Sequence, residues 1–374
     1  MRLHIFQDQK IVNRTISFFD EVFPRDNRFV VLIGPHDVDG KYVHKDPSRN
    51  IFCVNYYDPS FGVIVGNVSS YESVIIHFMF GDAIPFVNSI EHPNIFWIEW
   101  GADLYQGLLE RKGFTIYRSP KLLTKSLYPR VPYVFASLYS YIQKELLFRR
   151  LDKAIRKCRY FIPDSTPDEY RLMLDYYPQY SFLVPKDFFY YPIQEILGPL
   201  YGKQCVGDDV FIGNSCSFSN NHIYVFDKLR GIGIKSRIVV PLSYSGNEKY
   251  KEYVINYGKE CFGERFKPLL VYLPLDDYNN LFLNAKAFVF GNLRQEAVGN
   301  MIIAMYLGAR LFLEKENPMY RYYTGLGLKL NSMEELSLDL INKPLSKDEI
   351  ETNRSILDGL YSNTRMKSLI KNNF

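Results

Sequence analysis

Short apolar runs alternate with segments of helical periodicity through the second half of the chain, and this alternation constrains the fold more than any other feature. Strands are expected at DVFIGN, SRIVVP, PLLVYLP, KAFVFG, ARLFL and near Gly327, and helices at residues 221–229, 248–261, 276–285 and 297–308 and after Pro318. When a helix joins two parallel strands of one sheet, the connection is right-handed in nearly all proteins. The pattern therefore predicts an α/β domain with a doubly wound, Rossmann-like parallel sheet.

The first half carries apolar runs of similar length, at LHIF, FVVLIG, FGVIVG, SVIIHFMF and NIFWIEWG. Such runs indicate a buried, mainly parallel sheet, which RYFIPD and YSFLVP would complete. Proline and glycine interrupt the pattern between Pro185 and Gly207. With 374 residues, 47% of them hydrophobic, the chain has enough material for two cores. We expect a first domain at 1–190, a linker at 191–206, a second domain at 207–343 and a helical tail at 344–374 that returns to the first domain.

Several classes of protein are disfavoured by the composition. The five cysteines are scattered and form no C-x-x-C pair, so neither a disulfide framework nor a zinc site is expected, and a reducing cytoplasm suits the chain. Neither a signal-peptide core nor about eighteen uninterrupted apolar residues are present, so we expect at most a peripheral association with a membrane. The doublets Asp208-Asp209 and Asp276-Asp277 are better explained by structural roles, helix capping for the second, than by a metal site.

Positive charge is concentrated in one segment. Residues 111–160 hold thirteen Lys or Arg and two acidic residues, a net charge of +11, so the rest of a chain of net charge +4 carries −7. Within this segment a helix is expected whose basic face holds Arg149, Arg150, Lys153, Arg156 and Lys157. Such a helix suits an anionic membrane surface, although it could also be the solvated face of an ordinary domain helix. No RNP, zinc-finger or helix-turn-helix signature supports binding of nucleic acid.

Candidate ligand-binding residues follow the strands of the second domain, because open α/β sheets bind ligands at the carboxyl ends of their strands. Gly213, Asn214 and Ser215 form a small, polar turn before a helix, where backbone N–H groups can bind phosphate. Arg294 precedes another helix and can pair with a diphosphate, and Glu316 can accept hydrogen bonds from sugar hydroxyls. Ordinary turns and caps explain the same residues almost equally well.

The first domain offers acid–base candidates at the corresponding strand ends. Glu99 and Asp103 lie in WIEWGADLY, where a carboxylate facing a ligand is the usual group that deprotonates an attacking hydroxyl. His77 ends the run SVII and is the other candidate base. Helix capping is the alternative for Asp103, and a structural role is the alternative for His77.

The chain resembles the bacterial 4-acetamido-4,6-dideoxygalactosyl (Fuc4NAc) transferases of enterobacterial common antigen biosynthesis. WGADLY at residues 100–105 carries the resemblance, together with the turn at Gly213-Asn214-Ser215. It extends in order through Asn13-Arg14-Thr15, His77, residues 96–105, Asn221-His222, residues 239–241, Tyr244, Leu273, Asp276, Tyr278, Arg294-Gln295, Gly299 and Asn317-Pro318. The chain departs from the family at Glu296-Ala297, which stand where the family has a Gln-Gly pair, and residues 35–60 have no clear counterpart.

The resemblance implies a GT-B glycosyltransferase fold of two Rossmann-like domains facing a cleft, with a thymidine-diphosphate sugar as donor. It also implies an undecaprenyl-diphosphate-linked saccharide as acceptor, at the cytoplasmic face of the inner membrane, without metal or cofactor. The strand-end positions and the resemblance together suggest the donor-binding residues Gly213, Asn214, Ser215, Tyr244, Asp276, Tyr278, Arg294, Gln295, Gly299, Glu316 and Asn317. Asp103, His77 and Glu99 are the catalytic candidates. Two other hypotheses remain: a nucleotide-sugar epimerase of the same fold and a non-catalytic nucleotide-sugar binding protein.

Overall fold

The computed structural model describes residues 1–118, 145–163 and 166–374, and divides them into two compact units. Unit 1 comprises the described residues of 1–114, 145–191 and 364–374, and unit 2 comprises residues 115–118 and 192–363. Residues 192–206, for which a linker was expected, group with unit 2. The expected helical region between Ser119 and Arg159 lies outside the described residues up to 144, and residues 145–155 are helical.

Unit 1 is built on a parallel sheet in the order β3-β2-β1-β4-β5-β6-β7. Its strands are β1 (Arg2–Gln7), β2 (Asn27–Leu32), β3 (Ile51–Val54), β4 (Ser73–His77), β5 (Ile95–Ile98), β6 (Tyr160–Ile162) and β7 (Val184–Pro185). The strand order reverses between β1 and β4, which pair in parallel from Arg2 opposite Ser73 to Phe6 opposite His77. The helices are α1 (Val12–Val22), α2 (Ser60–Val65), α3 (Ala83–Ser89), α4 (Ala102–Tyr105), α7 (Asp168–Tyr176) and α16 (Asn363–Asn373).

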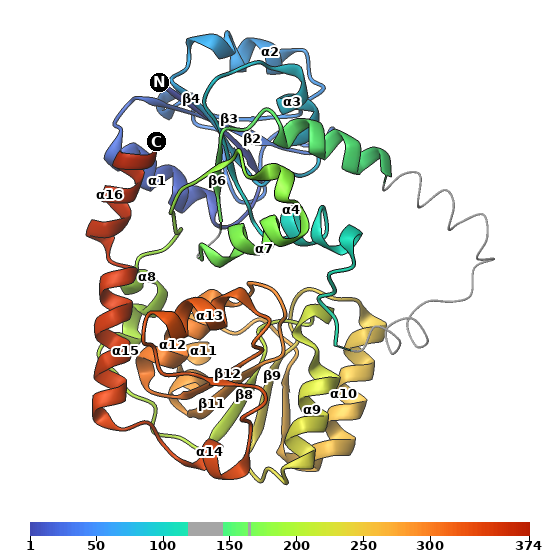
Figure 1. Ribbon diagram of the computed structural model, residues 1–374, viewed down its shortest axis with the longest axis vertical. Coiled ribbons are helices and arrows are strands. Elements are labelled where there is room, and N and C mark those ends of the chain that lie inside the picture. The colour runs from blue at the N-terminus through green and yellow to red at the C-terminus, as the bar shows by residue number, and fades with distance from the viewer. Residues whose placement is uncertain (119–144, 164–165) are drawn as a thin grey trace, which may run out of the picture. The chain divides into compact units, whose positions relative to one another are not determined.

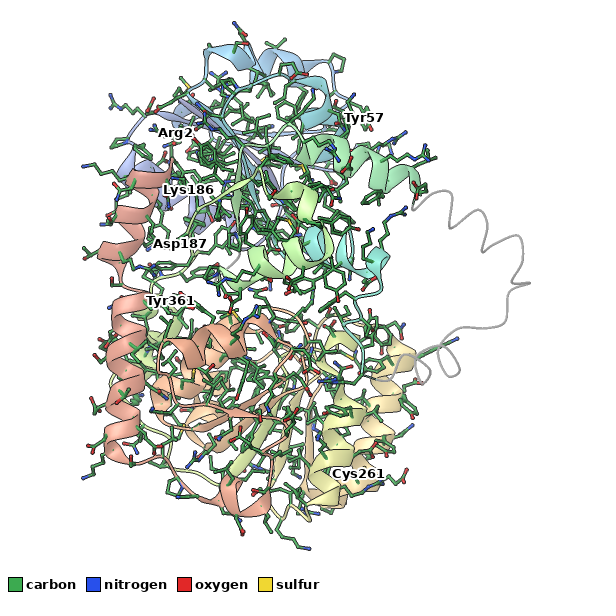
Figure 2. All side chains as sticks on the ribbon, viewed as in Figure 1. Arg2, Tyr57, Lys186, Asp187, Cys261 and Tyr361 are labelled. Carbon is green, nitrogen blue, oxygen red and sulfur yellow. The ribbon has the colours of Figure 1, made fainter. Side chains whose placement is uncertain are left out.

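The C-terminal helix α16 completes the core of unit 1. The ring of Phe374 packs 5.1 Å from the rings of both Phe19 and Phe96. The Arg2 side chain, labelled in Figure 2, donates a hydrogen bond of 2.8 Å from Nε to the Phe374 carbonyl. The last residues of the sequence are therefore joined to the first strand.

Two predicted strands of the first half differ from the structure. FGVIVG, expected as a strand, forms helix α2, because Asp58 Oδ1 accepts hydrogen bonds from the backbone N–H and the hydroxyl of Ser60 at its start. Val63 is 82% exposed, so this apolar run is not buried on both faces. Strand β3, absent from the predicted set, supplies the sheet edge instead. SVIIHFMF ends as a strand at His77, because Phe78 takes φ 77°.

Unit 2 is built on a second parallel sheet, in the order β10-β9-β8-β11-β12-β13. Its strands are β8 (Asp209–Ile212), β9 (Ile238–Pro241), β10 (Phe266–Leu269), β11 (Ala285–Phe290), β12 (Arg310–Leu313) and β13 (Asn331–Ser332). Its helices are α8 (Ile193–Leu197), α9 (His222–Gly231), α10 (Glu248–Phe262), α11 (Leu275–Leu283), α12 (Val298–Leu307), α13 (Pro318–Gly325), α14 (Leu338–Asn342) and α15 (Lys347–Leu360). The predicted alternation of strands and helices is thus confirmed. Two strands are displaced, however: β10 ends at Leu269, so most of PLLVYLP lies outside it with Val271 and Tyr272 exposed, and the strand expected near Gly327 is Asn331–Ser332.

The core of unit 2 lies on both faces of this sheet. Helices α9 and α10 pack side by side against one face (Figure 1), where Val225, Phe226 and Val254 are fully buried. Helix α12 is buried from Met301 to Leu307 and packs against α8, α15 and the strands β11 and β12. Short 3-10 helices occupy residues 47–49, 68–70, 109–112, 178–180, 198–200, 218–220 and 263–265.

Candidate functional site

The strand order of unit 2 reverses between β8 and β11, so the segments after these two strands leave the sheet at its topological switch point. Open α/β sheets bind ligands beyond the carboxyl ends of their strands at such a point. Residues 213–215 follow β8, residues 291–297 follow β11, and residues 314–317 follow β12, the next strand in the sheet. The topology thus brings three of the predicted donor-binding segments to one edge.

The turn after β8 is organised by the fully buried amide of Asn220. Its Oδ1 accepts a hydrogen bond of 3.0 Å from the Asn214 backbone N–H, and its Nδ2 donates one of 3.2 Å to the Ser215 hydroxyl. Gly213 takes φ 65°, and a Cβ at this position would lie 2.5 Å from Asn220 Oδ1. Only glycine fits both demands, so the small residues of this turn have a steric cause.

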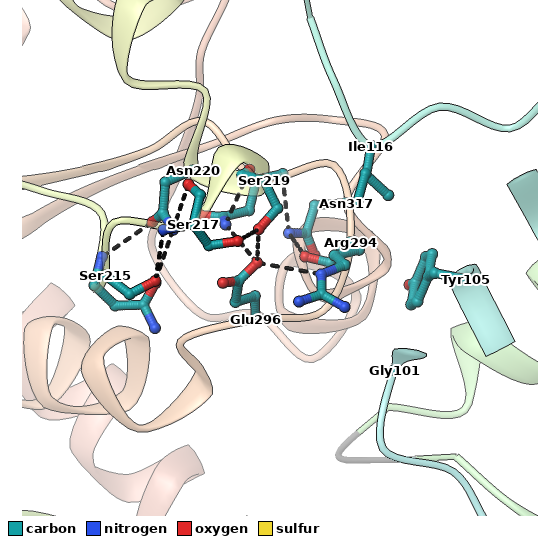
Figure 3. A network of polar contacts seen from close by, with 12 residues as sticks. Gly101, Tyr105, Ile116, Ser215, Ser217, Ser219, Asn220, Arg294, Glu296 and Asn317 are labelled. Atoms are coloured by element: carbon teal, nitrogen blue, oxygen red, sulfur yellow. Dashed lines mark hydrogen bonds and ion pairs between the residues drawn. The ribbon is translucent and has the colours of Figure 1, made fainter. Parts of the chain in front are cut away.

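A carboxylate joins the segments after β8 and β11. Glu296 Oε2 accepts hydrogen bonds from the Ser219 hydroxyl, from Asn292 Nδ2 at 3.1 Å and from Arg294 Nε at 3.2 Å (Figure 3). Glu296 therefore orients Arg294 through the Nε edge of its guanidinium group. Glu296 is one of the two residues that stand where the Fuc4NAc transferases have a Gln-Gly pair.

The N-terminus of α12 is suited to an anion. Ala297, its N-cap residue, takes φ 63°, which is strained for a residue with a side chain, and its methyl group cannot cap the helix as a polar N-cap side chain would. Gly299 in that turn leaves open space, because a Cβ there would have only Ile196 within 4.0 Å. The backbone N–H groups of the first turn and the helix dipole together favour a negatively charged ligand at this end.

The segment after β12 is tied to both neighbours. Asn317 caps α13 by accepting from the Met319 N–H at 2.9 Å, and its Nδ2 donates to the carbonyls of Asn292 at 3.0 Å and Arg294 at 2.6 Å. Glu314 is buried and Glu316 half-exposed, and Arg118 forms ion pairs with both.

Arg118 sets the ionisation of these two carboxyl groups. Burial raises the pKa of Glu314, and the hydrogen bond from Arg118 opposes that shift. At Glu316 burial would also raise the pKa, but the hydrogen bond and charge of Arg118 lower it below its usual value. Glu316 is thus held as a carboxylate, which is the acceptor form needed for a hydroxyl ligand.

The remaining predicted residues lie around this edge with weaker mutual contacts. The Tyr244 hydroxyl accepts a hydrogen bond of 3.3 Å from Asn214 Nδ2, and the Tyr278 hydroxyl accepts one of 3.3 Å from Asn300. Gln295 is buried, whereas Asp276 is exposed in the first turn of α11.

Two buried oxygens at the switch point, Asn214 Oδ1 and Asn292 Oδ1, have no hydrogen-bond partner within residues 1–118, 145–163 and 166–374. Leaving a buried polar atom unsatisfied costs about 1–3 kcal/mol, so such atoms mark a place where a polar ligand gains affinity. They follow β8 and β11, the strands that flank the reversal.

In unit 1, Asp103 is fully buried and joins the ends of β4 and β5. Its Oδ2 accepts from the Met79 N–H at 2.9 Å and from Trp97 Nε1 at 2.7 Å, and its Oδ1 accepts from the Trp100 N–H at 3.0 Å. Burial raises the pKa of Asp103, and these hydrogen bonds partly offset the increase. Glu99, also buried, accepts from the Gly101 N–H at 2.6 Å.

His77 is buried in a chain of hydrogen bonds. Its Nε2 lies 3.2 Å from His4 Nδ1, and its Nδ1 lies 3.4 Å from the Tyr190 hydroxyl. Burial holds the pKa of His77 well below its usual value and lowers that of His4 to about 3, so both rings are neutral at pH 7. His77, Glu99 and Asp103 therefore expose no side chain on the surface of unit 1.

The helix at residues 145–155 presents apolar and basic side chains to solvent. Leu146 and Leu147 are 44% and 43% exposed, whereas Leu151 is buried. Arg150 and Lys153 are exposed and form no ion pair within the part of the chain that the structure describes. Arg149 and Arg156 pair with acids one turn earlier, and Lys157 with Glu91.

The described residues contain no cluster of three or more His, Cys, Asp or Glu side chains arranged to hold a metal ion. Searched over the same residues, no helix has the length and hydropathy to cross a bilayer.

Three further residues organise the site. The sequence indicates Asn220 as a possible helix cap and places Asn292 beside Arg294 after the strand AFVFG, but assigns neither to donor binding, and no pattern indicates Arg118. Asn220 lies within the predicted turn, so the glycine at 213 was an indirect signal for it. Arg118 belongs to unit 2 but stands far before Glu314 and Glu316 in the sequence, and no local pattern links it to them.

Residues 170–355 match the family described as 4-alpha-L-fucosyltransferase, glycosyl transferase group 56. Among solved structures, the chain is similar to a glycosyltransferase from Rickettsia africae ESF-5, with 9% identity and a TM-score of 0.57 over 100% of this chain and 99% of that one. It is also similar to the UDP-forming trehalose-phosphate synthase from Burkholderia vietnamiensis, with 11% identity and a TM-score of 0.58 over 99% of both chains. Anabaena HepE in complex with UDP matches at 11% identity and a TM-score of 0.57, over 99% of this chain and 97% of that one. These likenesses show the GT-B fold.

Proposed function

We propose that the chain is a group 56 glycosyl transferase, a family that residues 170–355 match, and that it transfers a deoxy-amino sugar of the Fuc4NAc type from thymidine diphosphate to an undecaprenyl-diphosphate-linked saccharide. The product would belong to a surface polysaccharide or common antigen. The N-terminus of α12, with its strained N-cap residue Ala297 beside the oriented Arg294, is the observation that carries the donor half of this proposal. HepE, of the same fold, is solved in complex with UDP and with UDP-glucose, which supports a nucleotide sugar as ligand.

The donor diphosphate would bind at the switch point of unit 2. In this proposal the N–H groups of α12, the Arg294 guanidinium and the turn at Asn214 and Ser215 stabilise the charge that develops on the diphosphate as it leaves. Glu316, kept ionised by Arg118, accepts a hydrogen bond from a ribose or sugar hydroxyl. Tyr244, Asp276, Tyr278, Gln295, Gly299 and Asn317 would complete the donor-binding set. No metal or cofactor takes part.

Transfer breaks the bond between the anomeric carbon and the diphosphate oxygen and forms one to the acceptor oxygen, whose proton must go to a base. Asp103, His77 and Glu99 stay the candidates, because they are the titratable groups at the carboxyl ends of β4 and β5. Their burial sets a condition on the proposal. The base must gain contact with the acceptor hydroxyl in the complex.

The proposal is tested first by nucleotide preference. Thermal shifts are compared for thymidine, uridine, guanosine and cytidine diphosphates, because a ligand that binds the folded state raises the apparent stability. A preference for the thymidine nucleotide supports the donor class, and a preference for another nucleotide reassigns it. Conversion of the free donor sugar without an acceptor would instead indicate an epimerase, and binding without any turnover would indicate a binding protein.

We predict that Arg294→Ala weakens binding of thymidine diphosphate about 10- to 100-fold, because a charge-assisted hydrogen bond is worth about 1.5–3 kcal/mol. Isothermal titration calorimetry measures the change. Arg230→Ala is the matched control, since Arg230 lies exposed in the last turn of α9 at the opposite end of the sheet. Equal affinities for the Arg294 variant and the wild type would exclude this arginine from the diphosphate site.

The basic helix would bring the enzyme to the anionic cytoplasmic face of the inner membrane. Arg149, Arg150, Lys153, Arg156 and Lys157 are the proposed contacts, and the exposed Leu146 and Leu147 add apolar area.

We predict that the double substitution Arg150→Gln with Lys153→Gln lowers partitioning onto anionic vesicles about 30-fold, because each basic residue near such a surface contributes about 1 kcal/mol. Co-sedimentation measures it. Lys249→Gln with Lys259→Gln on α10 removes the same charge elsewhere and should leave partitioning unchanged. A similar loss in both double variants would show that net charge, not this helix, is responsible.

A further inference from the structure

An aromatic stack lies at the switch point of unit 1. Phe78 follows β4 directly, and its ring lies 5.2 Å from that of Phe80 and 5.5 Å from that of Trp100, with interplanar angles of 17° and 14°. The three rings are therefore nearly parallel. Phe80 is 39% exposed, and Phe78 and Trp100 are partly exposed. The stack follows the strand at which the strand order reverses, as the donor-site segments do in unit 2.

The backbone under this stack is strained. Phe78 takes φ 77°, a conformation that a bulky side chain rarely adopts. The turn is held there from three sides: the Phe80 N–H donates to the Phe78 carbonyl, the Met79 N–H donates to Asp103, and Gln7 Nε2 donates to the Phe80 carbonyl. Strain maintained by several contacts at a strand end is typical of a functional site.

Hydrogen bonds also fix Trp100, and their directions can be assigned. Asn27 Nδ2 donates to the carbonyls of Phe19 and Phe23, so its Oδ1 must accept from His4 Nε2. His4 Nδ1 then accepts from His77 Nε2, which leaves His77 Nδ1 to accept from the Tyr190 hydroxyl.

The Tyr190 oxygen accepts from Trp100 Nε1 at the end of this chain. The indole ring is thus held by a series of hydrogen bonds that begins in the core of the sheet. In this arrangement His77 acts as a positioning residue for Trp100.

We propose that this aromatic stack of Phe80, Phe78 and Trp100 binds a pyranose ring of the acceptor saccharide. The proposal rests on the function proposed above, which requires a sugar acceptor. A pyranose ring has an apolar face of C–H groups, which covers an aromatic ring, and a polar edge of hydroxyls. The Asp82 carboxylate, two residues beyond Phe80, makes no hydrogen bond or ion pair within the described residues and can accept from such hydroxyls. As an anion it disfavours a phosphate-bearing ligand at this position.

The only two tryptophans of the sequence provide the measurement. Trp97 is fully buried, whereas Trp100 belongs to the stack, so a change of fluorescence on adding a sugar reports on Trp100. The probes are the methyl glycosides of glucose, galactose, N-acetylglucosamine and N-acetylmannosamine. We expect at least one to change the fluorescence saturably. We expect Phe80→Ala to weaken that response about 3- to 10-fold, the range for loss of one aromatic contact.

Controls keep this test independent of the donor site. Phe182→Ala removes another exposed phenylalanine of unit 1, 45% exposed, and should leave the sugar response unchanged. Thymidine diphosphate should bind the Phe80 variant as it binds the wild type. If the wild-type protein binds no thymidine diphosphate but does bind a sugar through Phe80, the proposed function is contradicted and the sugar site at the stack is not. An absent sugar response, one unaffected by Phe80→Ala, or a response to the nucleotide through Phe80 would overturn the stack as a sugar site.

Discussion

Asp103→Ala is expected to lower the free energy of unfolding by about 3–6 kcal/mol, the largest effect of any single substitution considered. The carboxylate accepts hydrogen bonds from Met79, Trp97 and Trp100, and its removal leaves two buried donors and one partly buried donor without partners, at about 1–3 kcal/mol for each buried donor and less for the third. Urea denaturation followed by tryptophan fluorescence measures the loss, since both tryptophans lie in unit 1.

The Asn variant refines this expectation. Asp103→Asn keeps the shape but turns one oxygen into a donor, which then faces an N–H group, so an intermediate loss of stability is expected. Asp175→Asn, an exposed carboxylate in the same unit, is the control. Transferase activity per folded molecule separates the two roles of Asp103. Normal activity in the folded fraction of the Asn variant would exclude Asp103 as the base, and normal stability would contradict its role as a clamp.

Unit 1 is expected to lose about 2 kcal/mol of stability between pH 7 and pH 5 from His4 alone. Burial lowers the pKa of His4 to about 3, whereas an unfolded histidine titrates near 6.5. The unfolded chain therefore binds a proton in this range and the native chain does not, so stability is complete above about pH 6.5 and falls as the pH decreases. His77, whose pKa is also lowered by burial, adds a loss of the same sign.

Urea denaturation at pH 7 and pH 5, detected by fluorescence, tests this linkage. His4→Asn should be less stable at pH 7 but should show a pH dependence smaller by about 2 kcal/mol, because one titrating group is gone. His44→Asn, whose side chain is 75% exposed, controls for the loss of a histidine. An unchanged pH dependence in His4→Asn would mean that His4 is protonated in the native state.

The sequence predicts unit 2 well because its strands are buried on both faces and its helices are long. β11 and α12, for example, are apolar almost throughout, so their lengths of 6 and 10 residues distinguish strand from helix where periodicity cannot. Apolar character fails to predict a strand at FGVIVG. This segment forms a short helix that begins after Asp58 and ends at Gly66, and part of its apolar run faces solvent. Short runs with few residues cannot distinguish the two states by periodicity.

The candidate site was predictable where it depends on strand ends and unpredictable where it depends on amides that meet in space. Gly213, Asn214 and Arg294 follow strands, so topology alone brings them to one edge. Asn220 acts through hydrogen bonds to the turn just before it, whereas Asn292 donates to the carbonyl of Ser219, far away in the sequence, and a lone asparagine carries no pattern that announces either contact. The burial that keeps His77 neutral, and the hydrogen bonds that fix its tautomer, likewise follow only from the three-dimensional structure.

Unit 1 contains both the first and the last residues of the sequence, so the order of synthesis affects when it can fold. Its sheet begins at Arg2, yet Phe374 packs on Phe19 and Phe96 and binds Arg2 through its carbonyl. A ribosome must therefore translate through residue 374 before the core of unit 1 can close, whereas residues 192–363 are available earlier. The amino-terminal unit is thus expected to reach its native state after the second one, with its apolar surface exposed to chaperones in the interval.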